Sequence, residues 1–182
     1  HWVPTIDLPN ERFTTQITLT VPDSFQTLSN GRLVSSKAVD PLMREDSWEM
    51  NQPIQPYAMM FAIGKFSMYT TQFQQANDVR YYVEPDYAPY ANMMFQNTPE
   101  MMQFFSNYTG VLYPWKTYSQ IVVRDYVSGA MENTSASLFG EFMNQDSIAY
   151  ADGNHEDVVS HELFHQWFGD YVTAESWSHL TV

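Results

Sequence analysis

The sequence predicts an α+β fold in which a strand-rich part comes first and helices follow. Three observations lead to this prediction. The first third of the 182 residues alternates between apolar and polar side chains, a helix start follows near residue 98, and an amphipathic helical pattern lies near the carboxyl end. Hydrophobic residues make up 44% of the sequence and aromatic residues 16%. This is enough apolar surface for a packed core, which excludes a disordered chain.

Composition and charge exclude several functional classes. Eight Lys and Arg against 21 Asp and Glu give a net charge of −13, which repels a phosphate backbone and predicts that nucleic acid is not a partner. The absence of cysteine excludes disulfides, thiol nucleophiles and cysteine-based zinc fingers, and it leaves the cellular location open. The longest apolar run, 58–63, is far shorter than the ~20 residues of a membrane-spanning helix.

The strand-rich part begins with an alternating segment from Phe13 to Val21, which predicts a half-buried strand that ends at Pro22. Asn30-Gly31 separates two short strand-like segments. Because this dipeptide tolerates positive φ, we expect a two-residue hairpin turn there. Further strands are predicted at 48–50 and 58–66, and the second is nearly all apolar, so we expect it to be buried on both faces.

The second part combines strands with helices. Residues 67–83 continue the strand pattern, and helices begin in the aromatic run 87–95. Thr98-Pro99-Glu100 predicts a helix start with the Thr98 hydroxyl as N-cap, proline at the first position and an acid favoured by the helix dipole. Its apolar face is predicted to carry Met101, Phe104, Phe105 and Tyr108, and Gly110 to end it.

A short buried strand is expected at 121–123. No internal repeat or low-complexity linker separates the two parts, so we expect them to pack closely. We place the boundary at residue 66, which divides the chain into units 1–66 and 67–182.

Histidines are concentrated near the carboxyl end, where a helix is predicted from about Glu156 to Phe168, with Asn154 as N-cap and Gly169-Asp170 as its end. Four of the five histidines lie in the last 28 residues: His155, His161, His165 and His179.

Within this helix stands His161-Glu162-Leu163-Phe164-His165. A spacing of four places both imidazoles on one helical face, where they can share a Zn²⁺ ion, and Glu162 lies beside them within reach of an attacking water. The competing interpretation is a pair of helical histidines that arose by chance.

A catalytic zinc normally has three protein ligands, so a third residue is needed. Glu175 lies ten residues after His165 and would have to fold back across Gly169-Asp170. We therefore expect Glu175 to be a solvated residue in the first turn of a new helix capped by Thr173. His155 fits the helical face poorly, and His179 is interpreted as a packing or surface residue near Trp177.

A second motif, Gly129-Ala130-Met131-Glu132-Asn133, ends 28 residues before His161. Together the two motifs resemble the aminopeptidase N family of zinc metallopeptidases, the gluzincin aminopeptidases that include the leukotriene hydrolase branch. The similarity continues through 167–173 and, in the strand-rich part, through Asp7–Thr14, Ser29–Gly31 and Phe61–Phe66. It implies that 1–66 is the end of an amino-terminal β-domain and that 67–182 is the first half of a thermolysin-like catalytic domain.

The resemblance implies a role for each matched residue. His161 and His165 would bind zinc, and Glu162 would be the general base. Glu132 would bind the free α-amino group of a peptide substrate, although by itself it also fits an exposed acid in a turn. Gly129 and Ala130 would form the backbone strip along which an extended peptide lies, and Met131 and Asn133 are assigned to substrate binding with them.

The family's third zinc ligand is a glutamate eighteen intervening residues after the second histidine, which would fall two positions beyond Val182. We therefore expect this chain to be a fragment with little activity, cut from a zinc aminopeptidase that acts on peptides with a free amino terminus. Two alternatives remain open: a zinc endopeptidase of the thermolysin type, which Glu132 disfavours, and a catalytically dead relative that serves as a peptide-binding or scaffold module.

Overall fold

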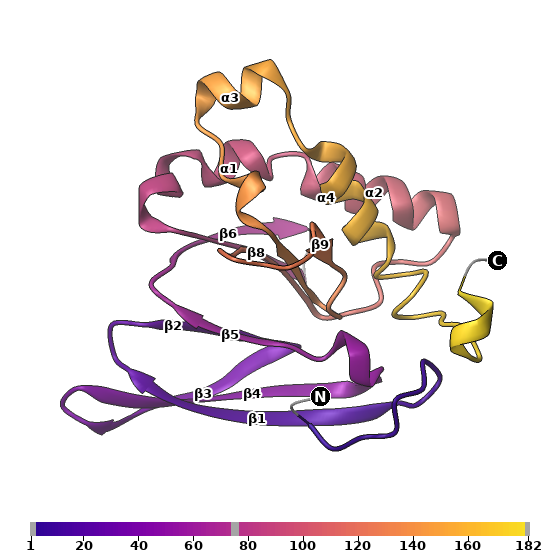
Figure 1. The fold of residues 1–182 in the computed structure, drawn as a ribbon, viewed down its shortest axis with the longest axis horizontal. Helices are drawn as coiled ribbons and strands as arrows, with labels where there is room; N and C mark the ends of the chain where they lie inside the picture. Colours follow the sequence, from indigo (N-terminus) through magenta and orange to yellow (C-terminus); the bar gives the residue numbers. More distant parts are fainter. Residues whose placement is uncertain (1–2, 74–76, 181–182) are drawn as a thin grey trace.

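The computed structural model describes residues 3–73 and 77–180, and it has the predicted α+β composition. The elements form layers: two small sheets lie at one side, a five-stranded sheet lies above them, and the α-helices cover the far face of that sheet (Figure 1). Among the described residues, none of the helices has both the length and the apolar character needed to cross a membrane.

The first sheet contains three antiparallel strands in the order β1-β4-β3. Along β1 the buried and exposed side chains alternate as predicted, since the side chains from Phe13 to Val21 with odd numbers face inward. The predicted strand at 48–50 is the middle of a much longer strand. The bounds are β1 Phe13–Pro22, β3 Arg32–Asp40 and β4 Met43–Ile54.

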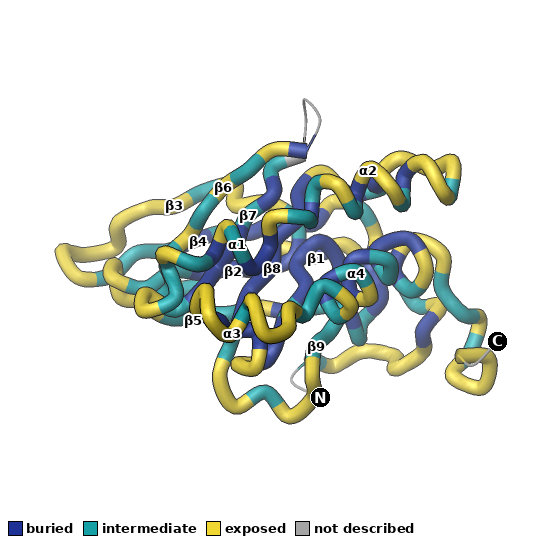
Figure 2. The backbone as a smooth tube through the Cα atoms, turned by 90° about the horizontal axis from the view of Figure 1, so that it is seen from above, coloured by how far each residue is buried: buried dark blue, intermediate teal, exposed yellow. Residues whose placement is uncertain are grey.

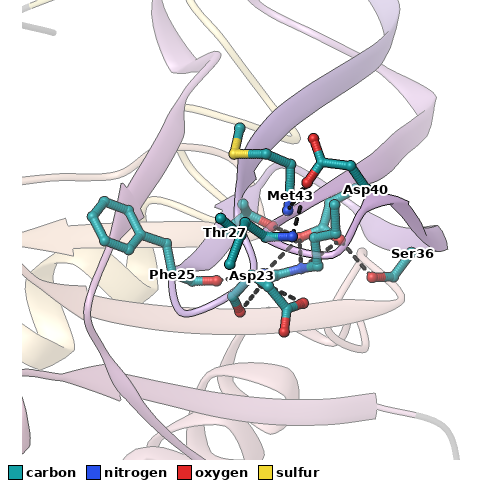
Figure 3. Close-up of polar contacts among 9 residues, drawn as sticks. Asp23, Phe25, Thr27, Ser36, Asp40 and Met43 are labelled. Carbon is teal, nitrogen blue, oxygen red and sulfur yellow. Dashed lines mark hydrogen bonds and ion pairs between the residues drawn. The ribbon is translucent and has the colours of Figure 1, made fainter.

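A polar cluster joins this sheet to its neighbour. Asp46, on β4, is buried and accepts hydrogen bonds from Thr27, Ser36 and Arg44. Burial opposes ionisation of Asp46, but these hydrogen bonds outweigh it and lower its pKa. At the end of the hairpin, Asp40 Oδ1 accepts from the backbone N–H of Met43, which closes the β3–β4 turn (Figure 3).

The hairpin predicted at Asn30-Gly31 is wrong. β2 (Gln26–Ser29) pairs with β5 (Phe61–Gly64), whereas β3 pairs with β4, so the dipeptide connects two sheets. Gly31 does adopt the positive φ that the prediction required, with φ of 80°. The difference arises because the buried side chain of Asn30 bonds to distant segments and not across a local turn.

Gly31→Ala is expected to destabilise the chain by about 2–4 kcal/mol, because the backbone is left-handed there and a Cβ would overlap the carbonyl of Glu49. Urea denaturation of the 182-residue chain measures the change. Gly153→Ala is the matched control, since a Cβ at Gly153 meets nothing within 4 Å. Equal stability of both variants would contradict the argument.

The predicted strand 58–66 is shorter and more exposed than expected. Residues Pro56–Ala58 form the 3₁₀ helix η1, and only Phe61–Gly64 form the strand β5. Phe61 and Ile63 are 43% and 41% exposed, because β5 belongs to a two-stranded sheet that packs on one side only. The expectation of burial on both faces is therefore wrong.

The five-stranded sheet has the order β6-β7-β8-β10-β9, in which β7, β8 and β10 are parallel and the two outer pairs are antiparallel. Every residue of the central strand β8 is buried, which confirms a buried strand at 121–122, although this strand starts at Thr117 and ends before Val123. The strands are β6 Ser67–Phe73, β7 Asn77–Val83, β8 Thr117–Val122, β9 Ala130–Met131 and β10 Ala136–Phe139.

Among the described residues, the helical layer contains four α-helices, and short 3₁₀ helices occur between other elements (Figure 1). The α-helices are α1 Ala91–Met94, α2 Thr98–Thr109, α3 Ser147–Asp152 and α4 Glu156–Phe164. The remaining 3₁₀ helices are η2 Pro85–Tyr90, η3 Glu141–Met143 and η4 Trp177–His179.

Helix α2 starts and ends near the predicted residues, and Gly110 ends it with a φ of 72°. Its buried stripe differs in part. Thr98, Met102 and Ser106 are buried, the predicted Met101 and Phe105 are half-buried and pack against the core, and the predicted Phe104 and Tyr108 are 60% and 75% exposed. Buried and exposed stretches alternate along α2 (Figure 2). The N-cap prediction is also wrong. Asn97 holds the cap position, and the Thr98 hydroxyl donates to Gln120 Oε1 on β8 at 2.8 Å, which turns this stripe toward the sheet.

The two parts of the chain pack closely, as predicted. One core cluster joins Met50 and Ile54 to Tyr118 and Trp167, and a second joins Trp48 to Ile121. Strand β5 belongs to the two-stranded sheet and β6 to the five-stranded sheet, so the chain passes from one sheet to another near residue 66. The division at residue 66 stays a prediction.

Candidate metal centre and its acidic neighbours

Helix α4 carries the histidine motif and is shorter than predicted. It begins after His155, which takes the N-cap position expected for Asn154, and it ends at Phe164 and not at residue 168. Beyond Phe164 the chain forms a tighter, 3₁₀-type turn, because the N–H groups of Gln166 and Trp167 each donate to the carbonyl three residues earlier. The buried Trp167 indole also donates to the Val111 carbonyl at 2.8 Å, which holds this turn against the loop after α2.

The two histidines of the motif face each other across one turn of α4. His161 Nε2 and His165 Nε2 are 3.1 Å apart, and the ring planes are at 84°. Two nitrogen ligands about 2.0–2.1 Å from a tetrahedral zinc are separated by a little over 3 Å, so this pair fits a shared metal ion. The structure thus brings together the two side chains that the spacing selected.

The other ring nitrogen of His165 is held by the backbone. Nδ1 lies 2.9 Å from the Phe168 carbonyl oxygen, which can only accept a hydrogen bond. Nδ1 therefore carries the proton, and Nε2 presents its lone pair toward His161. Metal-ligating histidines commonly show this arrangement.

Glu162 lies beside the pair and is buried, with 6% of its surface exposed. Its Oε2 atom has no hydrogen-bond partner within the described ranges. Burial, followed by the negative charge of Glu132, raises the pKa of Glu162 to about 7. A buried carboxylate with a free oxygen next to two facing imidazoles is suited to accept a proton from a bound water.

The Gly129–Asn133 segment lies next to this helix. Ala130 and Met131 form β9, the edge strand of the large sheet, and no described strand pairs with its outer side. Glu132 is half-buried and follows β9 directly. Met131, Glu132 and His165 line one open cavity of about 530 Å³, which also borders Tyr57 and Trp177.

The remaining candidate residues lie apart from the histidine pair or at its margin. Glu175 is exposed, and no helix begins at Thr173, so the predicted helix start there is wrong and the next helical residue is Trp177. His155 packs edge-on against Phe142, and exposed His179 lines the cavity. Within 3–73 and 77–180, no group of three His, Cys, Asp or Glu side chains is arranged to hold a metal.

Two further residues at this site were not predicted. Asp170 is fully buried, and neither of its carboxylate oxygens has a hydrogen-bond partner in the described part of the chain. Burial and the charge of Glu132 raise its pKa well above the usual range. Tyr57 donates to the Gly169 carbonyl at 3.1 Å and packs on Trp177. From the sequence, Asp170 is interpreted only as part of the end of the predicted helix, after Trp167-Phe168-Gly169.

Comparison with known proteins places the chain in a family. Residues 93–182 match the Peptidase family M1 domain. In alignments of 181 residues that cover 97% of the chain, it is 30% identical to Aminopeptidase M1 of Arabidopsis thaliana and 29% identical to Glutamyl aminopeptidase of Sus scrofa. The matched region is 20% and 19% of those two relatives, so the chain spans about a fifth of their length. The chain belongs to peptidase family M1, the aminopeptidase N family.

Proposed function

We propose that the protein carrying this chain is a zinc aminopeptidase, which removes single residues from the amino terminus of peptides. The observation that supports this most strongly is the pair of facing His161 and His165 Nε2 atoms beside the buried, partly unpartnered Glu162. In this proposal the two histidines supply two ligands of the metal. A bound zinc would polarise the scissile carbonyl and lower the pKa of the attacking water.

The proposed roles of the chain's own groups follow from their positions. His165 is oriented by the Phe168 carbonyl, so its Nε2 faces the metal position without rotation of the ring. Glu162 takes the proton of the attacking water. A pKa near 7 is suited to a general base at neutral pH, because the group is then partly ionised and still basic enough to accept a proton.

The outer edge of β9 supports an extended peptide as the substrate. Its backbone N–H and C=O groups can pair with a peptide strand, which is the usual mode of β-strand addition. Glu132 stands at the end of this edge and is proposed to bind the terminal ammonium. A fixed anion at that point favours peptides with a free amino terminus. It disfavours peptides whose chain continues past it, and an endopeptidase would have to bind such peptides.

The test compares a free peptide with its N-acetylated form, using the whole protein loaded with zinc. We expect release of single amino-terminal residues from the free peptide only. Glu132→Gln keeps the shape and removes the charge, so we expect kcat/KM for the free peptide to fall on the order of 10- to 100-fold, the range for a hydrogen bond to a charged group. Mass spectrometry of the products and steady-state kinetics measure both effects.

Glu175→Gln is the matched control, since Glu175 is exposed and should not alter the kinetics. Equal cleavage of the acetylated peptide would favour the endopeptidase alternative. Binding of the peptide without any cleavage would favour the peptide-binding or scaffold alternative.

A further inference from the structure

The segment 132–135, which joins β9 to β10, is held by two buried amide side chains from different parts of the chain. One is Asn30, from the strand-rich part, and the other is Gln166, the residue directly after His165. Both side chains are fully buried. Because this segment begins with Glu132, its position determines where the proposed amine-binding carboxylate stands.

Gln166 binds the segment through both ends of its amide. Nε2 donates to the Glu132 carbonyl at 3.1 Å and to the Asn133 carbonyl at 3.5 Å, while Oε1 accepts from the Ser135 N–H at 2.8 Å. The main chain of Gln166 is itself fixed, since its carbonyl accepts from the Trp115 indole at 3.2 Å. The side chain therefore forms a short link between the histidine helix and the backbone of Glu132.

Asn30 also binds this segment and ties it to the strand-rich part. Its Nδ2 donates to the Thr134 carbonyl at 2.7 Å and to the Ala58 carbonyl at 3.0 Å, and its Oδ1 accepts from Met60 N–H at 2.8 Å. The next residue adds a second contact to the segment, because the Gly31 N–H donates to Ser135 Oγ at 2.8 Å. All hydrogen-bonding groups of the Asn30 amide are thus used.

The conformation of the segment needs this support. Ser135 has a φ of 64°, in the left-handed region that a residue with a side chain rarely adopts. Its N–H, carbonyl and hydroxyl are bonded to Gln166, Ser119 and Gly31 respectively. Such a conformation persists when the surroundings fix it, and it often occurs where a functional group has to be placed accurately.

We infer that Gln166, supported by Asn30, is a positioning residue that sets the place of Glu132 relative to His161 and His165. This inference rests on the proposed aminopeptidase function. The separation between the amine anchor and the metal determines which peptide bond is presented for attack. Because Glu132 is proposed to bind the amino group of the substrate, a shift of its backbone would weaken substrate binding and raise KM more than it lowers kcat.

The test uses Gln166→Met in the whole protein, because methionine has a similar length and cannot form the three hydrogen bonds. We expect KM for a free peptide to rise about tenfold or more with a smaller change in kcat, and the zinc content to stay unchanged. Hydrogen exchange of the Ser135 amide should become at least about tenfold faster, since its acceptor is lost. Gln103→Met, on the exposed side of α2, is the matched control.

A second variant covers the case in which Gln166→Met fails to fold. In Gln166→Glu the carboxylate still accepts from Ser135 N–H but cannot donate to the Glu132 carbonyl. We therefore expect slow exchange at Ser135 together with a raised KM. Wild-type exchange in Gln166→Met, or a wild-type KM in Gln166→Glu, would overturn the inference. If wild-type protein releases no amino acid, the proposed function fails, whereas the exchange measurement still tests the link itself.

Discussion

Replacement of Glu162 by glutamine is expected to lower kcat of the zinc-loaded whole protein by about 10²–10⁴-fold, the range for loss of a general base. Glutamine preserves the size of the side chain but has no basic oxygen that can take a proton from water. KM should change much less, because the proposed contacts to the substrate are made by β9 and Glu132. Steady-state kinetics on a free peptide, with the zinc content measured in parallel, checks both quantities.

Glu100→Gln is a suitable control for this variant, since Glu100 is an exposed acid on α2. It should retain wild-type kinetics. If Glu162→Gln keeps more than about a tenth of the wild-type kcat with full zinc content, Glu162 is not the base and the assignment of the motif's central acid is wrong.

The histidine pair was predictable because its geometry is local. A helix of regular pitch brings residues four apart onto one face, so the spacing of His161 and His165 was enough to predict two facing rings. The alternation along β1 was predictable for the same reason, since a strand has a fixed period of two. In both cases the information lies within a few consecutive residues.

Errors occurred where a distant partner decides the outcome. Asn30-Gly31 has the composition of a hairpin turn, but the Asn30 amide bonds to Thr134, which lies 104 residues away in the sequence. On α2, apolarity alone favoured a buried face of Met101, Phe104, Phe105 and Tyr108, of which Phe104 and Tyr108 are exposed. The hydrogen bond from Thr98 to Gln120 on β8 accompanies a different buried stripe, and neither contact has a local signal.

The link through Gln166 could not be predicted for the same reason. Its acceptors and donors lie more than 30 residues earlier in the sequence, and a glutamine at the end of an amphipathic helix is ordinarily a solvated residue. The two motifs were therefore recognisable one by one, whereas the contact that joins them became visible only in the structure.

The three acids of the site affect each other. The charge of Glu132 contributes to the raised pKa of both Glu162 and Asp170, after burial as the first cause. A cation bound between the histidines would counteract this repulsion, which gives a physical reason for so much negative charge at one place. Asp170 is the extreme case because it is fully buried and its oxygens have no partner in the described ranges.

Asp170→Asn is expected to stabilise the 182-residue chain by about 1–3 kcal/mol at pH 7, because asparagine is neutral, whereas the buried carboxyl must take up a proton on folding or be buried as an anion. The raised pKa means that the folded state retains a proton on Asp170 that the unfolded state releases above its ordinary value of 3.8. Stability from this group is therefore present at low pH and is lost as the pH rises above about 4, until Asp170 ionises in the folded state as well. An asparagine does not titrate, so the variant should lose less stability over that interval.

Urea denaturation of the metal-free chain at several pH values between 4 and 8 measures the effect. Asp152→Asn, at an exposed residue of α3, is the matched control and should follow the wild-type curve. A loss of stability in Asp170→Asn at pH 7 would show that the ionised carboxylate is bound favourably in the folded chain. In that case Asp170 would contribute to stability as an anion, and its burial would not be the source of the pH dependence.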